Sequence, residues 1–369
     1  MRERDHVVRE ARPTLDTVAR AAGVSRMTVS NAYNRPDQIA GQTREKVLRI
    51  ARELGYAGPD PAARSLRRGR AGTVGVLLTE RLPYAFADPG LVAFLHGVAT
   101  ELADAGQALL LVPAESNTDH ALVRNAVVDG FVLASLARDD PAVADVLDRR
   151  LPVVTWGQPK LPNVPSVGID NARAVGKAAR HLLDLGHRRF GVVTLGPVVA
   201  NADADVPGNR LAMRRRVSGF VRTLSGAGID AAGVTMAGAT RNSRAAGAVA
   251  VRELLALPAK RRPTAIFAVT DVLALGALDA AAEAGIDVPQ MLSVVGFDDI
   301  GEAAASTPPL TTGSQSLFEQ GRIAARVVLD LLAGTVPALP RITPELVVRG
   351  STARPPGAPA TSSEKGWQR

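Results

Sequence analysis

The chain contains no cysteine, and this absence excludes disulfide bonds, cysteine-ligated metal sites and cysteine nucleophiles. Aromatic residues are scarce, at 4% of the 369 residues. No apolar run approaches the roughly 20 residues that a membrane-spanning helix needs. The first 13 residues, MRERDHVVREARP, also lack the apolar core of a signal peptide. We therefore expect a cytoplasmic protein that has no membrane partner.

Motifs of several common enzyme classes are absent as well. The sequence has no G-x-x-x-x-G-K-[ST], no G-x-G-x-x-G between a strand and a helix, no H-E-x-x-H and no G-x-S-x-G. His181 and His187 flank a helix-end pattern, where capping or packing is a more ordinary role than metal binding. We expect neither enzyme activity nor a metal site nor a cofactor. A plain solute-binding protein is a further class, but it would need a secretion signal and no basic N-terminal segment.

Almost all of the excess positive charge lies in the first 72 residues. The chain has a formal net charge of +8, and residues 1–72 hold 15 basic and 8 acidic residues. The rest of the chain holds 29 basic and 28 acidic residues. Solubility could explain an evenly spread charge. A basic module on a nearly neutral body instead indicates a polyanionic partner for that module.

Residues 14–34, TLDTVARAAGVSRMTVSNAYN, have the pattern of two short helices joined by a tight turn. Thr14 and Ser25 stand where side-chain oxygens would cap the two helices. Gly23 falls in the turn, where a residue free to adopt positive φ is needed. Apolar residues recur at helical spacing on the inner faces, at Leu15, Val18, Ala19, Ala22, Val29 and Ala32. This spacing is typical of a helix-turn-helix, whose second helix lies in the major groove of DNA.

An ordinary pair of amphipathic helices is the alternative interpretation of this pattern. The basic surroundings and the outward face expected for the second helix favour DNA binding. The residues on that face are suited to base edges and phosphates: Arg26, Met27, Thr28, Ser30 and Asn31.

A third helix is expected at residues 41–54, followed by a linker at residues 58–72. The apolar stripe of this helix consists of Val47, Leu48, Ile50, Ala51 and Leu54. In the linker, Asp60 and Pro61 form a helix-start signal. Leu66 is the one large apolar residue of the basic stretch that follows. It is either an isolated exposed leucine or a wedge for the minor groove, flanked by arginines.

From residue 73 onward, short apolar runs alternate with helical stretches. Strands are expected near residues 74–78, 108–112, 130–133, 153–155, 190–194, 235–237, 265–269 and 293–296. Helices are expected near residues 91–105, 119–127, 141–149, 171–185, 210–227, 242–256, 272–284 and 316–333. Such alternation predicts parallel sheets covered on both faces. A break near residues 161–166 divides the run into two Rossmann-like subdomains, with a ligand cleft at the carboxyl ends of the strands.

Headpiece, basic linker and two-lobed body together resemble the LacI/GalR family of bacterial transcription regulators, over about residues 13–350. The most specific match is TLDTVARAAGVSRMTVSNAYN followed by TREKVLRIARELGY. Further matches follow in the family's order, namely ARSL, VDG, DN, HLLDLGHRRFGVV, RVSGF, TDVLALGAL and VVGFDD. The resemblance implies an N-terminal all-α helix-turn-helix headpiece. It also implies an α/β body similar to periplasmic sugar-binding proteins, with a small effector in the cleft between two parallel-sheet subdomains.

The resemblance also implies DNA-contacting residues. Base-reading positions are Arg26, Met27 and Asn31, where Arg26 suits a bidentate pair with guanine. Phosphate-contacting positions are Thr14, Ser25, Thr28, Ser30, Asn34 and Thr43, which fix register and carry little sequence information. Minor-groove and hinge positions are Ala63, Arg64 and Leu66.

In the cleft, the resemblance assigns effector contacts to Arg216 and Asp298. A structural ion pair between the lobes is the alternative. Trp156 could stack on a sugar face or be an ordinary buried tryptophan. Thr270 stands where the family commonly has Asn or Asp, and the following Asp271 is expected to cap a helix. Gly157 replaces a cleft aspartate of some members, so a pocket less polar than that of a typical sugar-responsive member is expected.

Two departures from the family concern the headpiece and linker. Ala40 replaces the usual hydroxyl cap of the third helix, and the linker between Tyr56 and Leu66 is one residue longer than usual. The expected organisation is a mobile arm (1–12), a headpiece (13–57), a hinge (58–72), an effector-binding and dimerisation body (73–350) and a disordered tail (351–369). The tail has no leucine heptad that would form a coiled-coil tetramer. We expect a homodimeric repressor that binds a palindromic double-stranded DNA operator and responds to a small, sugar-like effector.

Overall fold

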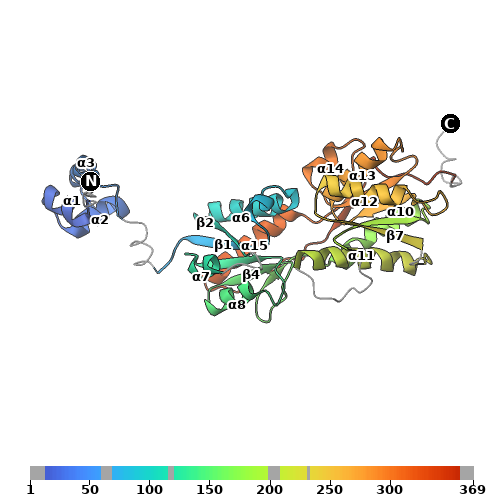
Figure 1. The fold of residues 1–369 in the computed structure, drawn as a ribbon. Coiled ribbons are helices and arrows are strands. Elements are labelled where there is room, and N and C mark those ends of the chain that lie inside the picture. Colours follow the sequence, from blue (N-terminus) through green and yellow to red (C-terminus); the bar gives the residue numbers. More distant parts are fainter. Residues whose placement is uncertain (1–12, 60–68, 115–119, 198–207, 231–232, 358–369) are drawn as a thin grey trace, which may run out of the picture. The chain divides into compact units, whose positions relative to one another are not determined.

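The computed structural model describes residues 13–59, 69–114, 120–197, 208–230 and 233–357 (Figure 1). The chain divides into two units, Met1–Ala71 and Gly72–Arg369. The finer domain boundaries that we expect at residues 12, 57 and 350 stay predictions. Within the described residues, no helix combines the length and the apolar character that crossing a membrane requires.

The described residues of the first unit form three α-helices and a short 3₁₀ helix. They are α1 (Leu15–Ala22), α2 (Arg26–Asn34), η1 (Pro36–Gln38) and α3 (Gly41–Glu53). Thr14 Oγ1 accepts a hydrogen bond from Thr17 N, and Ser25 Oγ accepts one from Thr28 N, as expected of helix caps. Gly23 has φ of 65°, the left-handed conformation that the turn requires. The helix-turn-helix prediction is therefore confirmed.

The three helices share one small core. It consists of Val18, Ala19, Ala22, Val29, Ala32, Val47 and Ala51, packed against partly buried neighbours. Of the stripe expected on α3, Leu54 lies beyond the helix and is exposed. Ala40 precedes α3 and provides no side-chain cap, as its sequence predicts.

The second unit contains two lobes, each built on a sheet (Figure 1). The first sheet is parallel throughout, in the order β2-β1-β3-β4-β5. Its strands are β1 (Thr73–Leu78), β2 (Ala108–Pro113), β3 (Gly130–Ala134), β4 (Val153–Trp156) and β5 (Ser166–Val167). One face packs on α6 (Pro89–Asp104) and α15 (Leu317–Leu332), and the other on α7 (Ala121–Asn125) and α8 (Pro141–Asp148). A short helix, α5 (Leu82–Ala85), precedes α6.

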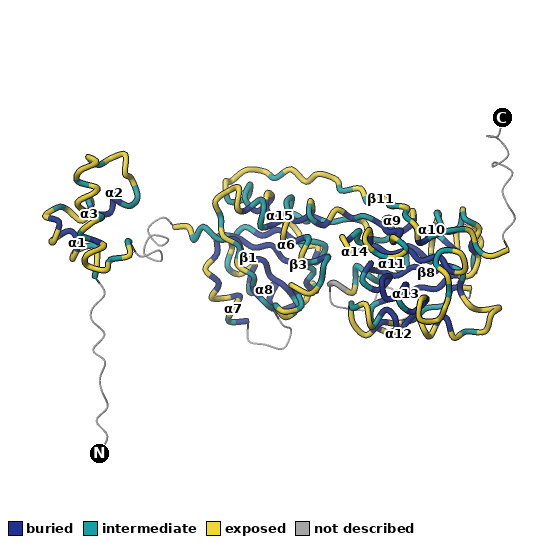
Figure 2. The backbone as a smooth tube through the Cα atoms, turned by 90° about the horizontal axis from the view of Figure 1, so that it is seen from above, coloured by how far each residue is buried: buried dark blue, intermediate teal, exposed yellow. Residues whose placement is uncertain are grey.

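The second sheet has the order β11-β10-β9-β8-β6-β7, and only β11 runs antiparallel to its neighbour. Its strands are β6 (Phe190–Leu195), β7 (Val234–Ala239), β8 (Ala265–Ala268), β9 (Ser293–Asp298), β10 (Thr311–Ser314) and β11 (Glu345–Val347). Its helices are α9 (Asn171–Ala174), α10 (Gly176–Asp184), α11 (Gly208–Gly226), α12 (Arg244–Leu255), α13 (Asp271–Glu283) and α14 (Gly301–Ala305). Figure 2 shows the buried strands at the centre of both lobes.

The lobes are not the two consecutive halves that the sequence suggested. Helix α15 follows the second sheet in the chain, yet its Ala324, Ala325, Val327 and Val328 belong to the core of the first lobe. The chain then returns to the second sheet as β11. Strands β5, β10 and β11 and helices α5 and α14 were not predicted.

The start of the expected disordered tail is ordered against the second sheet, so the prediction is wrong there. Ser351 is fully buried, and its Oγ donates to Val294 O and accepts from Thr311 N. His187 lies in the same region, with Nε2 2.9 Å from Ala353 O, and has the packing role that we expected. Residues 358–369 lie outside the described residues.

Candidate functional site

The proposed base-reading side chains lie at the start of α2, on the surface of the first unit. Met27 is 68% exposed, which is unusual for a large apolar side chain and suits an apolar contact with a partner. The Arg26 guanidinium is also exposed and forms an ion pair with Asp16 of α1, with Nε 2.8 Å from Oδ1. Asn31 is partly exposed one turn further along.

The proposed phosphate-contacting residues differ in exposure. Thr14 and Ser25 are exposed caps, while Thr28, Asn34 and Thr43 are partly exposed. Ser30 was expected on the outward face, but it is only 8% exposed and lies next to the Asn34 amide. The expectation is wrong because Ser30 is buried and its hydroxyl oxygen lies 3.3 Å from Asn34 Nδ2. Ala63, Arg64 and Leu66 lie outside the described residues.

A cavity opens between the two lobes of the body at the carboxyl ends of β1, β3, β4, β6, β8 and β9. Its volume is about 140 Å³, and it is partly open to solvent. Arg216, Asp298, Trp156 and Thr270, the residues that we assigned to the effector, all line this cavity. The first lobe contributes apolar walls, which include Leu78 and Leu91. A lining of apolar walls with a few convergent polar groups is typical of small-molecule sites.

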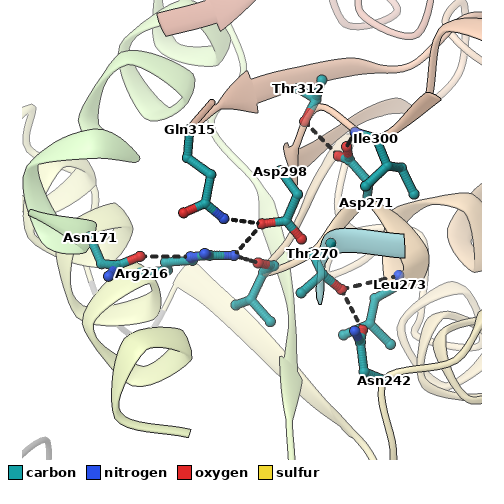
Figure 3. Close-up of polar contacts among 12 residues, drawn as sticks. Asn171, Arg216, Asn242, Thr270, Asp271, Leu273, Asp298, Ile300, Thr312 and Gln315 are labelled. Carbon is teal, nitrogen blue, oxygen red and sulfur yellow. Dashed lines mark hydrogen bonds and ion pairs between the residues drawn. The ribbon is translucent and has the colours of Figure 1, made fainter. Parts of the chain in front are cut away.

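Arg216 projects from α11 and is held on three sides (Figure 3). Its Nε donates to Asn171 Oδ1, and its Nη1 donates to both Val269 O and Asp298 Oδ1, at 2.6 and 3.0 Å. The guanidinium lies over the Phe297 ring, 4.2 Å from the centroid. Only 3% of the residue is exposed. Nη2 has no hydrogen-bond partner among the described residues, so it remains a donor for a ligand.

Asp298 ends β9 and adopts φ of 136°, an uncommon conformation for a non-glycine residue. Its Oδ1 accepts hydrogen bonds from Arg216 and from Gln315 Nε2, at 2.6 Å for the latter. Oδ2 has no such partner among the described residues. The burial of Asp298 raises its pKa to about 7; Arg216 acts against the rise, and the charges of Asp271 and Asp88 add to it. The pair thus offers one free acceptor beside one free donor.

Trp156 packs against the core of the first lobe and also lines the cavity. One face of its indole stacks on Phe94, with ring centroids 3.8 Å apart, as in an ordinary core. The residue is nevertheless part of the cavity lining. Its Nε1 donates to Gln320 Oε1, and Gln320 Nε2 donates to Gln315 O, so the ring orientation is fixed. A fixed ring on the cavity wall is suited to stacking on a sugar or a planar ligand.

Thr270, rather than Asp271, caps α13. Thr270 Oγ1 accepts from Leu273 N and donates to Asn242 Oδ1, so the hydroxyl is already engaged (Figure 3). Asp271 occupies the first turn instead and accepts from Ile300 N and Thr312 Oγ1. Our expectation that Asp271 is the cap was wrong by one residue.

A polar contact that the sequence did not predict joins the lobes. Asn242 Nδ2, in the second lobe, donates to Asp88 Oδ2 in the first lobe at 3.0 Å. Tyr84 OH donates to the same oxygen at 2.8 Å, and Asp88 Oδ1 caps α6. Burial and Asp88 together raise the pKa of Tyr84. No group of acidic or histidine side chains in the described part of the chain could hold a metal ion.

Both units match known families. Residues 14–58 match the model of bacterial regulatory proteins of the lacI family, and residues 179–352 match that of a periplasmic binding protein-like domain. The HTH-type transcriptional regulator Rv3575c of Mycobacterium tuberculosis is 40% identical over 356 residues, which cover 94% of this chain and 98% of that protein.

Solved structures of related regulators are similar as well. A complex of the transcriptional regulator CelR with cellobiose is 32% identical, with a TM-score of 0.64, and the match covers 92% of this chain and 100% of CelR. The lac repressor dimer bound to operator and the anti-inducer ONPF is 25% identical, with a TM-score of 0.75 and coverage of 92% and 99%.

These relatives are named as regulators and not as enzymes, in agreement with the expectation from the sequence. The predicted fold class, a helix-turn-helix headpiece followed by a body like a periplasmic binding protein, is confirmed. The protein is a DNA-binding transcription regulator and belongs to the LacI family of bacterial regulatory proteins.

Proposed function

We propose that this protein is a cytoplasmic repressor that binds a palindromic operator as a homodimer. Its affinity for the operator falls or rises when a sugar-like effector binds in the cleft. The solved lac repressor is a dimer bound to operator, and its likeness to this chain supports the same assembly here. The solved CelR structure contains cellobiose, which supports a carbohydrate effector.

The Arg216–Asp298 pair carries the effector part of this proposal. Among the described residues, no hydrogen bond engages Nη2 of Arg216 or Oδ2 of Asp298, and both residues line the cavity. A hydroxyl both donates and accepts, so two neighbouring hydroxyls of a polyol could satisfy both atoms, with charge-assisted hydrogen bonds. The fixed ring of Trp156 offers an apolar surface for the C–H face of a sugar.

The DNA part rests on the exposed residues of α2. Arg26 and Met27 are the proposed base readers, together with Asn31, and Arg26 suits guanine while Met27 suits a thymine methyl. Thr14, Ser25, Thr28, Asn34 and Thr43 are the proposed phosphate contacts. Ala63, Arg64 and Leu66 are proposed to enter the minor groove, with Leu66 as the wedge.

The operator-binding and effector-binding sites are coupled only because each ligand binds the alternative arrangements of the lobes with different affinity. An effector that binds one arrangement of the lobes more tightly shifts the population toward that arrangement. The operator is then bound more weakly or more tightly by the same coupling free energy.

Selection of bound duplexes from a random pool tests the proposal directly. We expect the purified full-length protein to enrich a two-fold symmetric site whose half-sites contain a guanine opposite Arg26. Cellobiose and other neutral sugars are then screened for a change in the affinity for that site. The proposal fails if the protein prefers no duplex over scrambled competitor at moderate salt, with or without sugars.

A further inference from the structure

The ion pair between Arg26 and Asp16 joins the first turns of two helices. Arg26 is the first residue of α2, and Asp16 lies in the first turn of α1. The Thr14 and Ser25 caps fix both turns, and the common core of the first unit packs α1 against α2. The backbones that carry the two charges are therefore held at a constant separation, and the Nε–Oδ1 distance is 2.8 Å.

The contact leaves the far end of Arg26 available. Nε is the guanidinium nitrogen nearest to Asp16, and no hydrogen bond of the terminal Nη1 and Nη2 atoms is found among the described residues. A guanidinium binds guanine O6 and N7 through two of its nitrogens, which makes the terminal pair the natural donors. An exposed arginine loses side-chain freedom when it is immobilised, and a partner that restricts it beforehand lowers that cost on binding.

A purely structural role for Asp16 makes a different prediction. A cation at the start of a helix opposes the helix dipole, and α2 has no acidic residue in its own first turn. Asp16 offsets the charge of Arg26 there. This effect alone would change the stability of the headpiece without changing which base is preferred.

We propose that Asp16 is a positioning residue that holds Arg26 for guanine recognition and so sets the strength of discrimination at that base pair. This inference rests on the base-reading role proposed for Arg26. It adds a specificity-determining residue on α1, the helix that precedes the recognition helix.

The chain contains a matched control in the same headpiece. Arg49 and Glu53 of α3 form an ion pair of the same length, 2.8 Å, with side chains that are 60% and 58% exposed. The Arg26 and Asp16 side chains are 69% and 51% exposed. Asp16→Ala and Glu53→Ala each remove one negative charge from the basic module, so their effects on general attraction to DNA are alike.

The experiment uses the full-length protein and the operator obtained by random-pool selection. Competition binding is measured on that operator and on versions in which each base pair is replaced in turn. The proteins compared are the wild type, Asp16→Ala, Asp16→Asn, Glu53→Ala, Arg26→Ala and Asp16→Ala combined with Arg26→Ala. Thermal unfolding of each protein is recorded in parallel, and Asp16→Asn serves if the alanine variant does not fold.

We expect the Asp16 variants to reduce discrimination about two- to fivefold, and only at the base pair where Arg26→Ala loses the preference for guanine. This range corresponds to the free energies that exposed ion pairs contribute. Glu53→Ala keeps the wild-type discrimination at every pair. The double variant loses no more discrimination at this base pair than Arg26→Ala alone, because Asp16 acts there through Arg26.

Three results would overturn the inference: unchanged discrimination in the Asp16 variants, an equal loss at all base pairs, or a loss confined to thermal stability. These results differ from a failure of the proposed function, in which the wild-type protein itself selects no operator.

Discussion

Among single residues, Asp298 shows how burial and neighbouring charges oppose each other. Burial favours the neutral acid, and so do the nearby carboxylates of Asp271 and Asp88. Arg216 and Gln315 favour the carboxylate through direct contacts. The resulting pKa of about 7 places the titration of Asp298 in the physiological range.

This titration predicts that effector affinity rises with pH. The hydroxyls of a polyol donate to the ionised carboxylate, and protonation removes acceptor strength from Oδ2. With a pKa of about 7, the ionised fraction rises about tenfold from pH 6 to pH 8. Calorimetric titration with the effector should give an affinity up to about tenfold higher at the upper pH. Asp298→Asn should remove the trend; a flat profile in the wild type would contradict it.

Arg216 should be needed for the effector response and not for operator binding. Arg216→Ala removes the Nη2 donor, and burial then keeps Asp298 neutral, so the cleft loses both charges of this pair. We expect operator affinity close to that of the wild type and no response to effector, measured by binding to labelled operator. Arg215→Ala, an exposed arginine one position away on α11, is the control. A normal response of Arg216→Ala would refute the assignment.

At the scale of elements, helices with local signals were predicted best. The caps at Thr14 and Ser25 and the positive φ of Gly23 depend on residues no more than four positions apart, so the sequence suffices. Errors of one residue remained where two candidates stand side by side. Thr270 is the cap in place of Asp271. Ser30 was expected on the outward face of α2 but is buried beside Asn34.

Elements that depend on distant partners were missed. Strands β5 and β11 have two and three residues, and each is defined by its pairing with a remote strand. Helix α15 was predicted correctly as a helix, but the lobe on which it packs was not, because its apolar face could pack on either sheet. The Arg216–Asp298 pair was found through the family resemblance, whereas Asn242 and Asp88 lie 154 positions apart and no local pattern joins them.

The crossing of α6 and α15 predicts a clear effect of a single methyl group. A Cβ on Gly97 would lie 2.0 Å from Phe318 O, and one on Gly321 would lie 2.0 Å from Phe94 O. Gly97→Ala must therefore separate the helices. It should lower the free energy of unfolding by about 1–3 kcal/mol, the usual cost of overpacking. Phe94 would move with α6, so the Trp156 fluorescence should change as well.

Gly226→Ala, near the end of α11, is the matched control for this prediction. Nothing lies within 4 Å of a Cβ there, so the helix propensity of alanine should stabilise the protein by up to about 1 kcal/mol. Urea unfolding of the full-length variants measures both effects. Equal stabilities of the two variants would show that the α6–α15 contact is looser than described.

For the whole molecule, direct contacts between the lobes favour closure of the cleft. The Asn242–Asp88 hydrogen bond is one, and it is backed on both sides, by Tyr84 and the α6 cap in one lobe and by Thr270 in the other. Because both ends are held, breaking this bond should release the lobes without disturbing either core. Asn242 thereby influences the balance of open and closed cleft, the quantity that an effector must shift.

We predict that Asn242→Ala opens the cleft. A hydrogen bond to a charged group contributes about 1.5–3 kcal/mol, enough to shift the ratio of closed to open lobes by about tenfold or more. The absence of native cysteine allows site-specific spin labels at Asp148→Cys on α8 and Glu253→Cys on α12, two exposed positions in different lobes. The distance distribution between the labels should lengthen and broaden in Asn242→Ala. Arg244→Ala, which breaks only the exposed pair with Asp279 inside the second lobe, should leave it unchanged. If both variants give the wild-type distribution, the Asn242–Asp88 contact does not control closure. The lobes are then held together by the three chain segments that cross between them and by a chain of hydrogen bonds. This chain runs through Trp156, Gln320, Gln315 and Asp298.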